Sequence, residues 1–142
     1  MTRKIVATLV AMGVVGVLAS CTGRASFGDE TFADVERVLE RGELEICSHT
    51  NHPDGLANQA TASRTYVVAL DCDGDDTVRM VVDRFDDAVD RDAAAQQFEV
   101  ALRPRGDGAV WTYGPFTVFA NGGRDDAVMD ALTASLDQVG AR

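Results

Sequence analysis

The chain has 142 residues, of which 23 are acidic and 13 are basic, and its formal net charge is −10. An acidic chain suits neither nucleic acid, whose phosphates attract basic patches, nor the surface of an anionic bilayer. The length is enough for one compact domain and too short for two.

The first twenty residues are organised like a signal sequence. Arg3 and Lys4 precede an apolar run at 5–17 that only threonine and glycine interrupt. The run is shorter than the roughly 20 apolar residues that a membrane-spanning helix needs. Residues 18–21, Leu-Ala-Ser-Cys, follow it and resemble the lipobox of bacterial lipoprotein precursors.

This resemblance implies cleavage by signal peptidase II before Cys21 and attachment of lipid to that cysteine. It divides the chain into a signal peptide at 1–20, a lipidated tether at 21–30 and a single extracytoplasmic α+β domain at 31–142. Loss of Arg3 and Lys4 with the signal changes the net charge from −10 to −12. The alternatives are an ordinary secretory signal or a one-pass anchor in which Cys21 is incidental.

The first half of the domain is predicted to be a helix followed by three strands. The helix starts after Thr31, with Asp34 as its capping partner, and ends at Gly42. A short strand at 44–47 leads into a polar loop of sixteen residues at 48–63. Alternating residues at 65–71 and 77–85 around an acidic turn predict a β-hairpin.

The second half is predicted to be a helix, a hairpin and a last helix. The helix covers 86–103 and ends at Pro104, and strands at 110–113 and 116–120 flank Gly114-Pro115. Asp125 and Asp126 suit the first turn of the last helix. The order α-β-β-β-α-β-β-α predicts an α+β fold, with an antiparallel sheet of four to five strands and helices packed on one face.

Two cysteines remain once Cys21 is acylated. An even pair in an oxidising compartment favours a disulfide between Cys47 and Cys72. Alternatively, the Cys47 thiolate and the imidazoles of His49 and His52 are ligands for zinc or copper. A disulfide removes the thiolate, so these interpretations exclude each other unless the histidines bind a metal with Asp54 instead. We expect no cofactor, and the sequence leaves the identity of any metal open.

A second resemblance rests on the spacing of several of these features. A helix ends in glycine before a cysteine (Gly42, Cys47), and Cys72 lies at a hairpin turn. Phe85 then ends a strand before a helix, and an aromatic-glycine hairpin (Tyr113-Gly114) precedes the last helix. Over about residues 31–141 this pattern resembles a group of small actinobacterial lipoproteins of unknown role. The resemblance supports the disulfide and the fold, and it implies no active site.

The sequence contains no nucleophile elbow, phosphate-binding loop or His-Glu-x-x-His motif, so we expect a protein that is not an enzyme. We expect a lipid-anchored binding or accessory module whose partner is an envelope protein or a small ligand, with no nucleic acid. The 48–63 segment and the exposed side of the sheet are its predicted contact surfaces. The alternatives are a metal-handling lipoprotein using His49 and His52, or an unrecognised enzyme. Four aromatic residues of the last hairpin either pack in the core or line a ligand groove: Trp111, Tyr113, Phe116 and Phe119.

Overall fold

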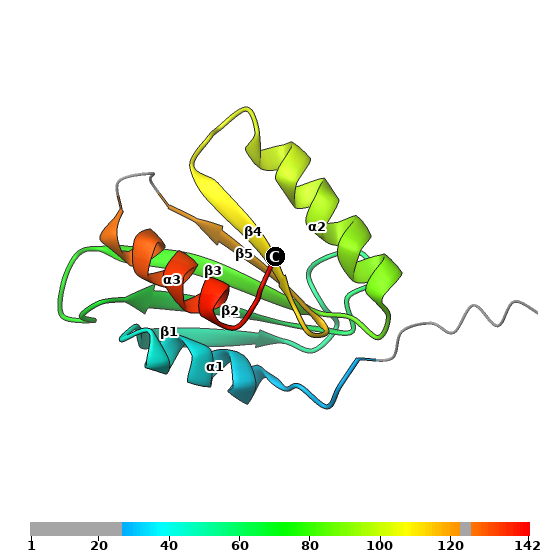
Figure 1. Ribbon diagram of the computed structural model, residues 1–142, viewed down its shortest axis with the longest axis horizontal. Helices are drawn as coiled ribbons and strands as arrows, with labels where there is room; N and C mark the ends of the chain where they lie inside the picture. The colour runs from blue at the N-terminus through cyan, green and yellow to red at the C-terminus, as the bar shows by residue number, and fades with distance from the viewer. Residues whose placement is uncertain (1–26, 123–125) are drawn as a thin grey trace, which may run out of the picture.

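The predicted element order and the α+β class are confirmed in a computed structural model, which describes residues 27–122 and 126–142 (Figure 1). All neighbouring strands are antiparallel, and the sheet order is β1-β2-β3-β5-β4. In chain order the elements are α1 (Phe32–Arg41), β1 (Glu45–His52), β2 (Ala62–Ala69), β3 (Thr77–Arg84), α2 (Ala88–Leu102), β4 (Gly108–Tyr113), β5 (Phe116–Asn121) and α3 (Ala127–Gln138).

The predicted signal peptide and Cys21 lie outside the described residues. A membrane-spanning helix, with the length and the apolar composition that this requires, is absent from residues 27–122 and 126–142. The tether predicted at 21–30 is described only from Phe27 onward.

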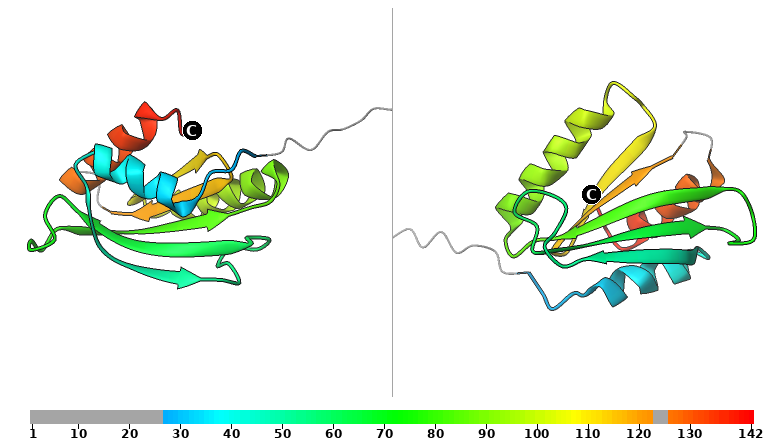
Figure 2. Two further views of the ribbon diagram at one scale, coloured as in Figure 1. Left: turned by 90° about the horizontal axis from the view of Figure 1, so that it is seen from below. Right: turned by 180° about the vertical axis from the view of Figure 1, so that it is seen from behind.

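Helices α1 and α3 cover one face of the sheet and enclose the main core. Alternate residues of β3 and β5, such as Met80 and Val118, point into this core and are fully buried. Leu39 of α1 and Leu132 of α3 are equally buried above them. In the left view of Figure 2, both helices lie on the same side of strands β1, β2 and β3.

Helix α2 packs on the opposite face, so the prediction of helices on one face is wrong for this element. Its Phe98 stacks on Phe119 of β5 with ring centroids 5.1 Å apart. The Thr117 hydroxyl donates a hydrogen bond to the carbonyl oxygen of Arg91 at 3.2 Å. Thr117 and Phe119 alternate with Val118, so they belong to the second face. The β4–β5 part of the sheet therefore has helices on both sides.

Strand β1 is longer than predicted, and the prediction of a sixteen-residue loop at 48–63 is wrong. Residues 48–52 continue β1, and Thr50 and His52 pair with Thr65 and Ser63 of β2. The remaining connection is 53–61. Strand β1 is an edge strand whose residues are partly or fully exposed, so polar side chains occupy both faces and no apolar alternation marks it. A bulge at Cys47 further disturbs the pattern.

At the start of each helix an aspartate side chain accepts hydrogen bonds from free main-chain N–H groups. The Asp34 carboxylate accepts the N–H of Thr31 at 2.6 Å, as the predicted capping box requires. The Asp87 carboxylate accepts the N–H groups of Val89 and Asp90, and Asp126 caps α3. These caps start α2 and α3 next to the two ends of the β4–β5 hairpin.

Candidate functional site

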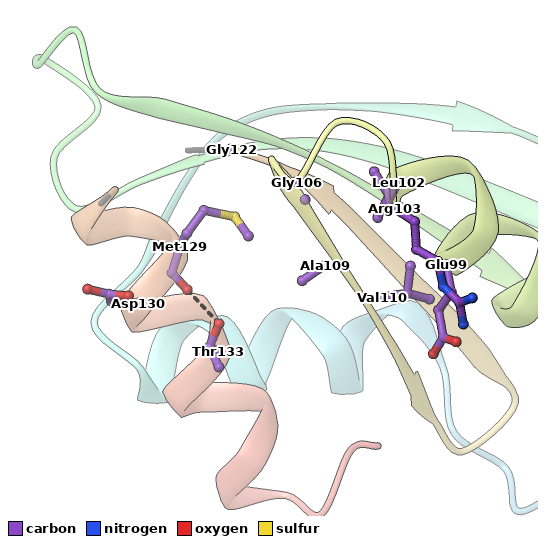
Figure 3. Close-up of a pocket in the computed structure, with 11 residues that line it drawn as sticks. Glu99, Leu102, Arg103, Gly106, Ala109, Val110, Gly122, Met129, Asp130 and Thr133 are labelled. Atoms are coloured by element: carbon purple, nitrogen blue, oxygen red, sulfur yellow. Dashed lines mark hydrogen bonds between the residues drawn. The ribbon is translucent and has the colours of Figure 1, made fainter. Parts of the chain in front are cut away.

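A groove lies at the β4 edge of the sheet, between α2 and α3 (Figure 3). Its volume of about 580 Å³ is within the range of protein ligand sites. It forms because α2 and α3 pack on opposite faces near the edge strand. Its walls are Glu99, Leu102 and Arg103 on the α2 side and Met129, Asp130 and Thr133 on the α3 side.

The floor of the groove is mostly main chain. Gly108, Ala109 and Val110 of β4 line it. A Cβ atom on Gly108 would lie 2.8 Å from the carbonyl oxygen of Ala120 and 2.8 Å from the Cδ2 atom of Leu102. Only glycine therefore lets the α2 wall approach β4 this closely, and the small floor residues leave the strand accessible from the groove.

The floor strand has a free edge at Val110. Successive residues of an antiparallel ladder direct their N–H and C=O groups alternately toward the partner strand and away from it. Within residues 27–122 and 126–142, strand β4 has β5 as its one neighbouring strand, and Thr112 makes its main-chain bonds on the side away from β5. Val110 is two residues before Thr112, so its N–H and C=O groups also point out of the sheet. Among the residues that the structure describes, none pairs with Val110 on that side.

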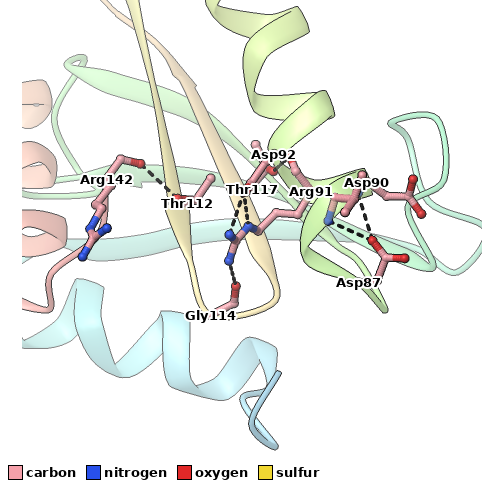
Figure 4. Close-up of polar contacts among 9 residues, drawn as sticks. Asp87, Asp90, Arg91, Asp92, Thr112, Gly114, Thr117 and Arg142 are labelled. Carbon is pink, nitrogen blue, oxygen red and sulfur yellow. Dashed lines mark hydrogen bonds and ion pairs between the residues drawn. The ribbon is translucent and has the colours of Figure 1, made fainter. Parts of the chain in front are cut away.

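The same edge is already paired at Thr112. The N–H of Thr112 donates to the main-chain oxygen of Arg142 at 2.6 Å, and the N–H of Arg142 donates to the Thr112 carbonyl at 3.1 Å. The Thr112 hydroxyl adds a third bond to Arg142 at 3.2 Å (Figure 4). This reciprocal exchange is the pattern of an antiparallel pair. Arg142 thus covers one residue of the edge, and Val110 stays open beside it.

The N-terminal segment is held at the turn end of β4, away from the groove. The Arg91 guanidinium donates to the carbonyl oxygen of Gly114 at 2.5 Å, and it pairs with Asp92 at 2.6 Å (Figure 4). The same guanidinium lies 5.0 Å from the centre of the Phe27 ring. These contacts place Phe27 beside Gly114 in the β4–β5 turn and beside the first turn of α2, which carries Arg91.

No protein-family model, curated protein or solved structure matches this chain.

The predicted disulfide between Cys47 and Cys72 is confirmed. The two sulfur atoms are 2.07 Å apart and the Cα atoms 5.3 Å apart. The bridge joins the bulge in edge strand β1 to the connection between β2 and β3. It leaves Cys47 no thiolate to offer a metal.

The structure does not bring the other proposed metal ligands together. His49 packs 6.2 Å from the Tyr66 ring, whereas the Nε2 atom of His52 lies 3.1 Å from the Thr65 hydroxyl. Tyr66 and Thr65 are adjacent in β2, so the two histidines lie on opposite faces of the sheet. Asp54 lies beyond the end of β1. Within residues 27–122 and 126–142, no three His, Cys, Asp or Glu side chains gather as a metal site would require.

A buried Ser63–Asp83 pair holds the 53–61 connection against the sheet. The Ser63 hydroxyl donates to the Asp83 carboxylate and accepts the N–H of Leu56 at 2.7 Å. Asp83 also accepts the N–H of Ala57 at 3.3 Å. Both side chains are almost completely buried. No local signal in the sequence marks this pair, because Ser63 was predicted to lie in a loop and Asp83 is one of 23 acidic residues.

The Ser63–Asp83 pair does not have the geometry of a hydrolase site. His52 is opposite Ser63 across the β1–β2 ladder, yet its ring faces Thr65. A serine nucleophile needs a base that accepts its proton and is itself oriented by an acid. Here the Ser63 hydroxyl donates its hydrogen bond directly to the Asp83 carboxylate, and the two side chains together hold the main chain of the 53–61 connection.

A second polar network joins α1 to β2 on the helix-covered face. The Arg64 guanidinium contacts the Glu36 carboxylate and the side-chain oxygen of Asn51. The Tyr66 hydroxyl donates to Glu36 at 3.1 Å. Burial raises the pKa of Tyr66 above its ordinary value near 10, and the neighbouring Arg64 opposes this effect. The network is a structural connection between helix and sheet.

The raised pKa of Tyr66 predicts a loss of stability at alkaline pH. The folded state keeps the phenolic proton where the unfolded chain releases it, so unfolding becomes easier as pH rises above about 10. We expect the free energy of unfolding to fall less steeply in Tyr66→Phe than in the parent. Denaturant titrations on both sides of pH 10 measure this difference. Tyr113→Phe retains Tyr66 and is the matched control, and a parent-like slope in Tyr66→Phe would contradict the prediction.

The aromatic residues of the β4–β5 hairpin do not line the groove. Trp111 and Phe116 are buried in the main core, and Tyr113 packs against it. Phe119 is covered by Phe98 of α2. Of the two alternatives for these aromatic residues, packing against the helices therefore holds, and the smaller residues Ala109 and Val110 line the groove instead.

Proposed function

We propose that this chain is a bacterial lipoprotein attached through Cys21 to the outer face of the cell membrane, with residues 31–142 forming a non-catalytic binding module. Its partner is another envelope component. Most of the 48–63 segment is strand or tightly held connection, so we assign binding to the groove at the β4 edge. The open groove with a free strand edge is the observation that carries this assignment.

Two features support an extracytoplasmic location of the domain. The Leu-Ala-Ser-Cys motif follows a short apolar run and supplies a cysteine for lipid attachment. The two remaining cysteines form a disulfide, which is typical of oxidising compartments and rare in the cytosol. Both features fit a chain that is exported from the cytoplasm.

The path of the N-terminal segment gives the domain an orientation relative to the proposed anchor. Five residues lie between Cys21 and Phe27, so the six Cα–Cα steps from one to the other span at most about 22 Å. Phe27 lies against Arg91 at the β4–β5 turn. The turn would therefore be near the bilayer, and the groove at the Gly108 end of β4 would open away from it. A site in that position is accessible to partners in the envelope.

Lipid attachment is tested by labelling the full chain in a bacterium that has lipoprotein-processing enzymes. We expect the parent to incorporate radiolabelled palmitate and to fractionate with membranes. Cys21→Ala is expected to lose the label, because no other residue supplies the acylated thiol at the cleavage site. Thr22→Ala keeps Cys21 and is expected to retain the label. An unlabelled parent, or label that persists in Cys21→Ala, would contradict the proposal.

A further inference from the structure

We infer that the free edge of β4 binds an extended polypeptide segment of a partner protein, which adds to the sheet as a sixth strand between α2 and α3. This inference rests on the proposed function and narrows its partner to a peptide. The segment runs antiparallel to β4 and carries at least one basic side chain.

The main chain at the edge specifies a peptide. The outward N–H and C=O groups of β4 recur at every second residue, which is a spacing of about 7 Å along a strand. Gly108 and Val110 both present such groups next to the groove. An extended polypeptide repeats donors and acceptors at this interval, and strand addition at a free edge is an established mode of peptide recognition.

Arg142 shows that this edge accepts a main chain and indicates the direction of the strand. Its reciprocal bonds with Thr112 are those of an antiparallel neighbour of β4. A strand that starts next to Arg142 and runs antiparallel to β4 would pass Trp111 and then lie opposite Val110. The incoming segment would therefore extend an interaction that the chain already makes at one residue.

The groove has room for the side chains of such a strand on both sides of the sheet. Leu102 of α2 lines one wall, and Met129 of α3 lines the other. Alternate residues of an added strand would point toward these two walls. The apolar wall residues suit small or apolar side chains at the centre of the segment.

The charges around the groove favour a basic partner. Two carboxylates, Glu99 and Asp130, line it with one guanidinium, that of Arg103. Neither carboxylate forms an ion pair with another residue in the part of the chain that the structure describes. The whole chain is also strongly acidic, which attracts cationic segments over longer distances.

The test uses the full processed chain in detergent and a displayed library of random linear peptides as the probe. We expect the parent to enrich peptides containing lysine or arginine. Val110→Pro removes the outward N–H without breaking the ladder to β5, and an edge strand tolerates proline there. We expect this variant to bind the selected peptide about tenfold more weakly, as measured by fluorescence anisotropy. Val110→Ala keeps the N–H and is the matched control, with a smaller loss.

A second measurement does not depend on how the variant folds. Methylating the peptide main-chain nitrogens one at a time is expected to weaken binding to the parent at every second position, because alternate N–H groups face β4. A flat methylation profile, or peptide binding unaffected by Val110→Pro in a folded variant, would overturn strand addition. Failure to enrich any peptide, or self-association of the chain through this edge, would also overturn it. Palmitate labelling is measured separately, so failure of the anchor is distinguishable from failure of the peptide site.

Discussion

Replacing Cys47 and Cys72 together by serine is expected to lower the free energy of unfolding by about 3.5 kcal/mol. The bridge closes a loop across a sequence separation of 25 residues. Without it the unfolded chain gains conformational entropy, which favours unfolding. The bridge also ties edge strand β1 to the β2–β3 connection, so we expect β1 to lose protection first. Denaturant unfolding and hydrogen exchange of the processed chain measure these two effects.

The control for this prediction is the parent protein in reductant, which should reproduce the loss of the serine double variant. Ser48→Ala, on the exposed part of β1, is expected to change stability by no more than about 0.5 kcal/mol. A loss below about 1 kcal/mol in the double variant would contradict the prediction. It would mean that the unfolded chain already keeps these two segments together.

Replacing Phe116 by alanine is expected to lower the free energy of unfolding by about 3–5 kcal/mol. Its side chain is completely buried, and its ring centroid lies 5.3 Å from that of Phe32 at the start of α1. The truncation leaves a cavity where the β4–β5 turn, α1 and the sheet meet. Thermal or denaturant unfolding of the processed chain measures the loss.

Val100→Ala is the surface control for Phe116→Ala. Val100 is on α2 and its side chain is 62% exposed, so its truncation removes little buried area. We expect a change within about 0.5 kcal/mol. If Phe116→Ala cost no more than Val100→Ala, the core around the hairpin would not be packed as described.

The element order was predictable because local signals agreed at most boundaries. Thr31 with Asp34 marks the start of α1, and Gly114-Pro115 marks the β4–β5 turn. Alternating Val78, Met80 and Val82 identify one buried face of β3. These signals act over a few residues, so they are readable without knowledge of the fold.

The predictions of the length of β1 and of the position of α2 were wrong because tertiary contacts, rather than local sequence patterns, determine both. Strand β1 continues through polar residues at 48–52 because its main chain pairs with β2, whatever its side chains are. Helix α2 lies on the opposite face because Phe119 gives β5 an apolar residue there as well. The nearly continuous apolar run of β5 is typical of a strand buried on both faces, and it could have indicated this arrangement.

The class of the fold, the order of its elements and the favoured cysteine pair were predictable from the sequence, because caps, turns, apolar periodicity and cysteine number are local or compositional. The three-dimensional structure was needed to show that His49 and His52 lie on opposite faces and that Ser63 meets Asp83. It also decided that β5, rather than β4, lies next to β3. This strand order leaves β4 with a free edge between α2 and α3. It depends on contacts between segments that are distant in the sequence and that pack on the two faces of the sheet, so no local pattern encodes it.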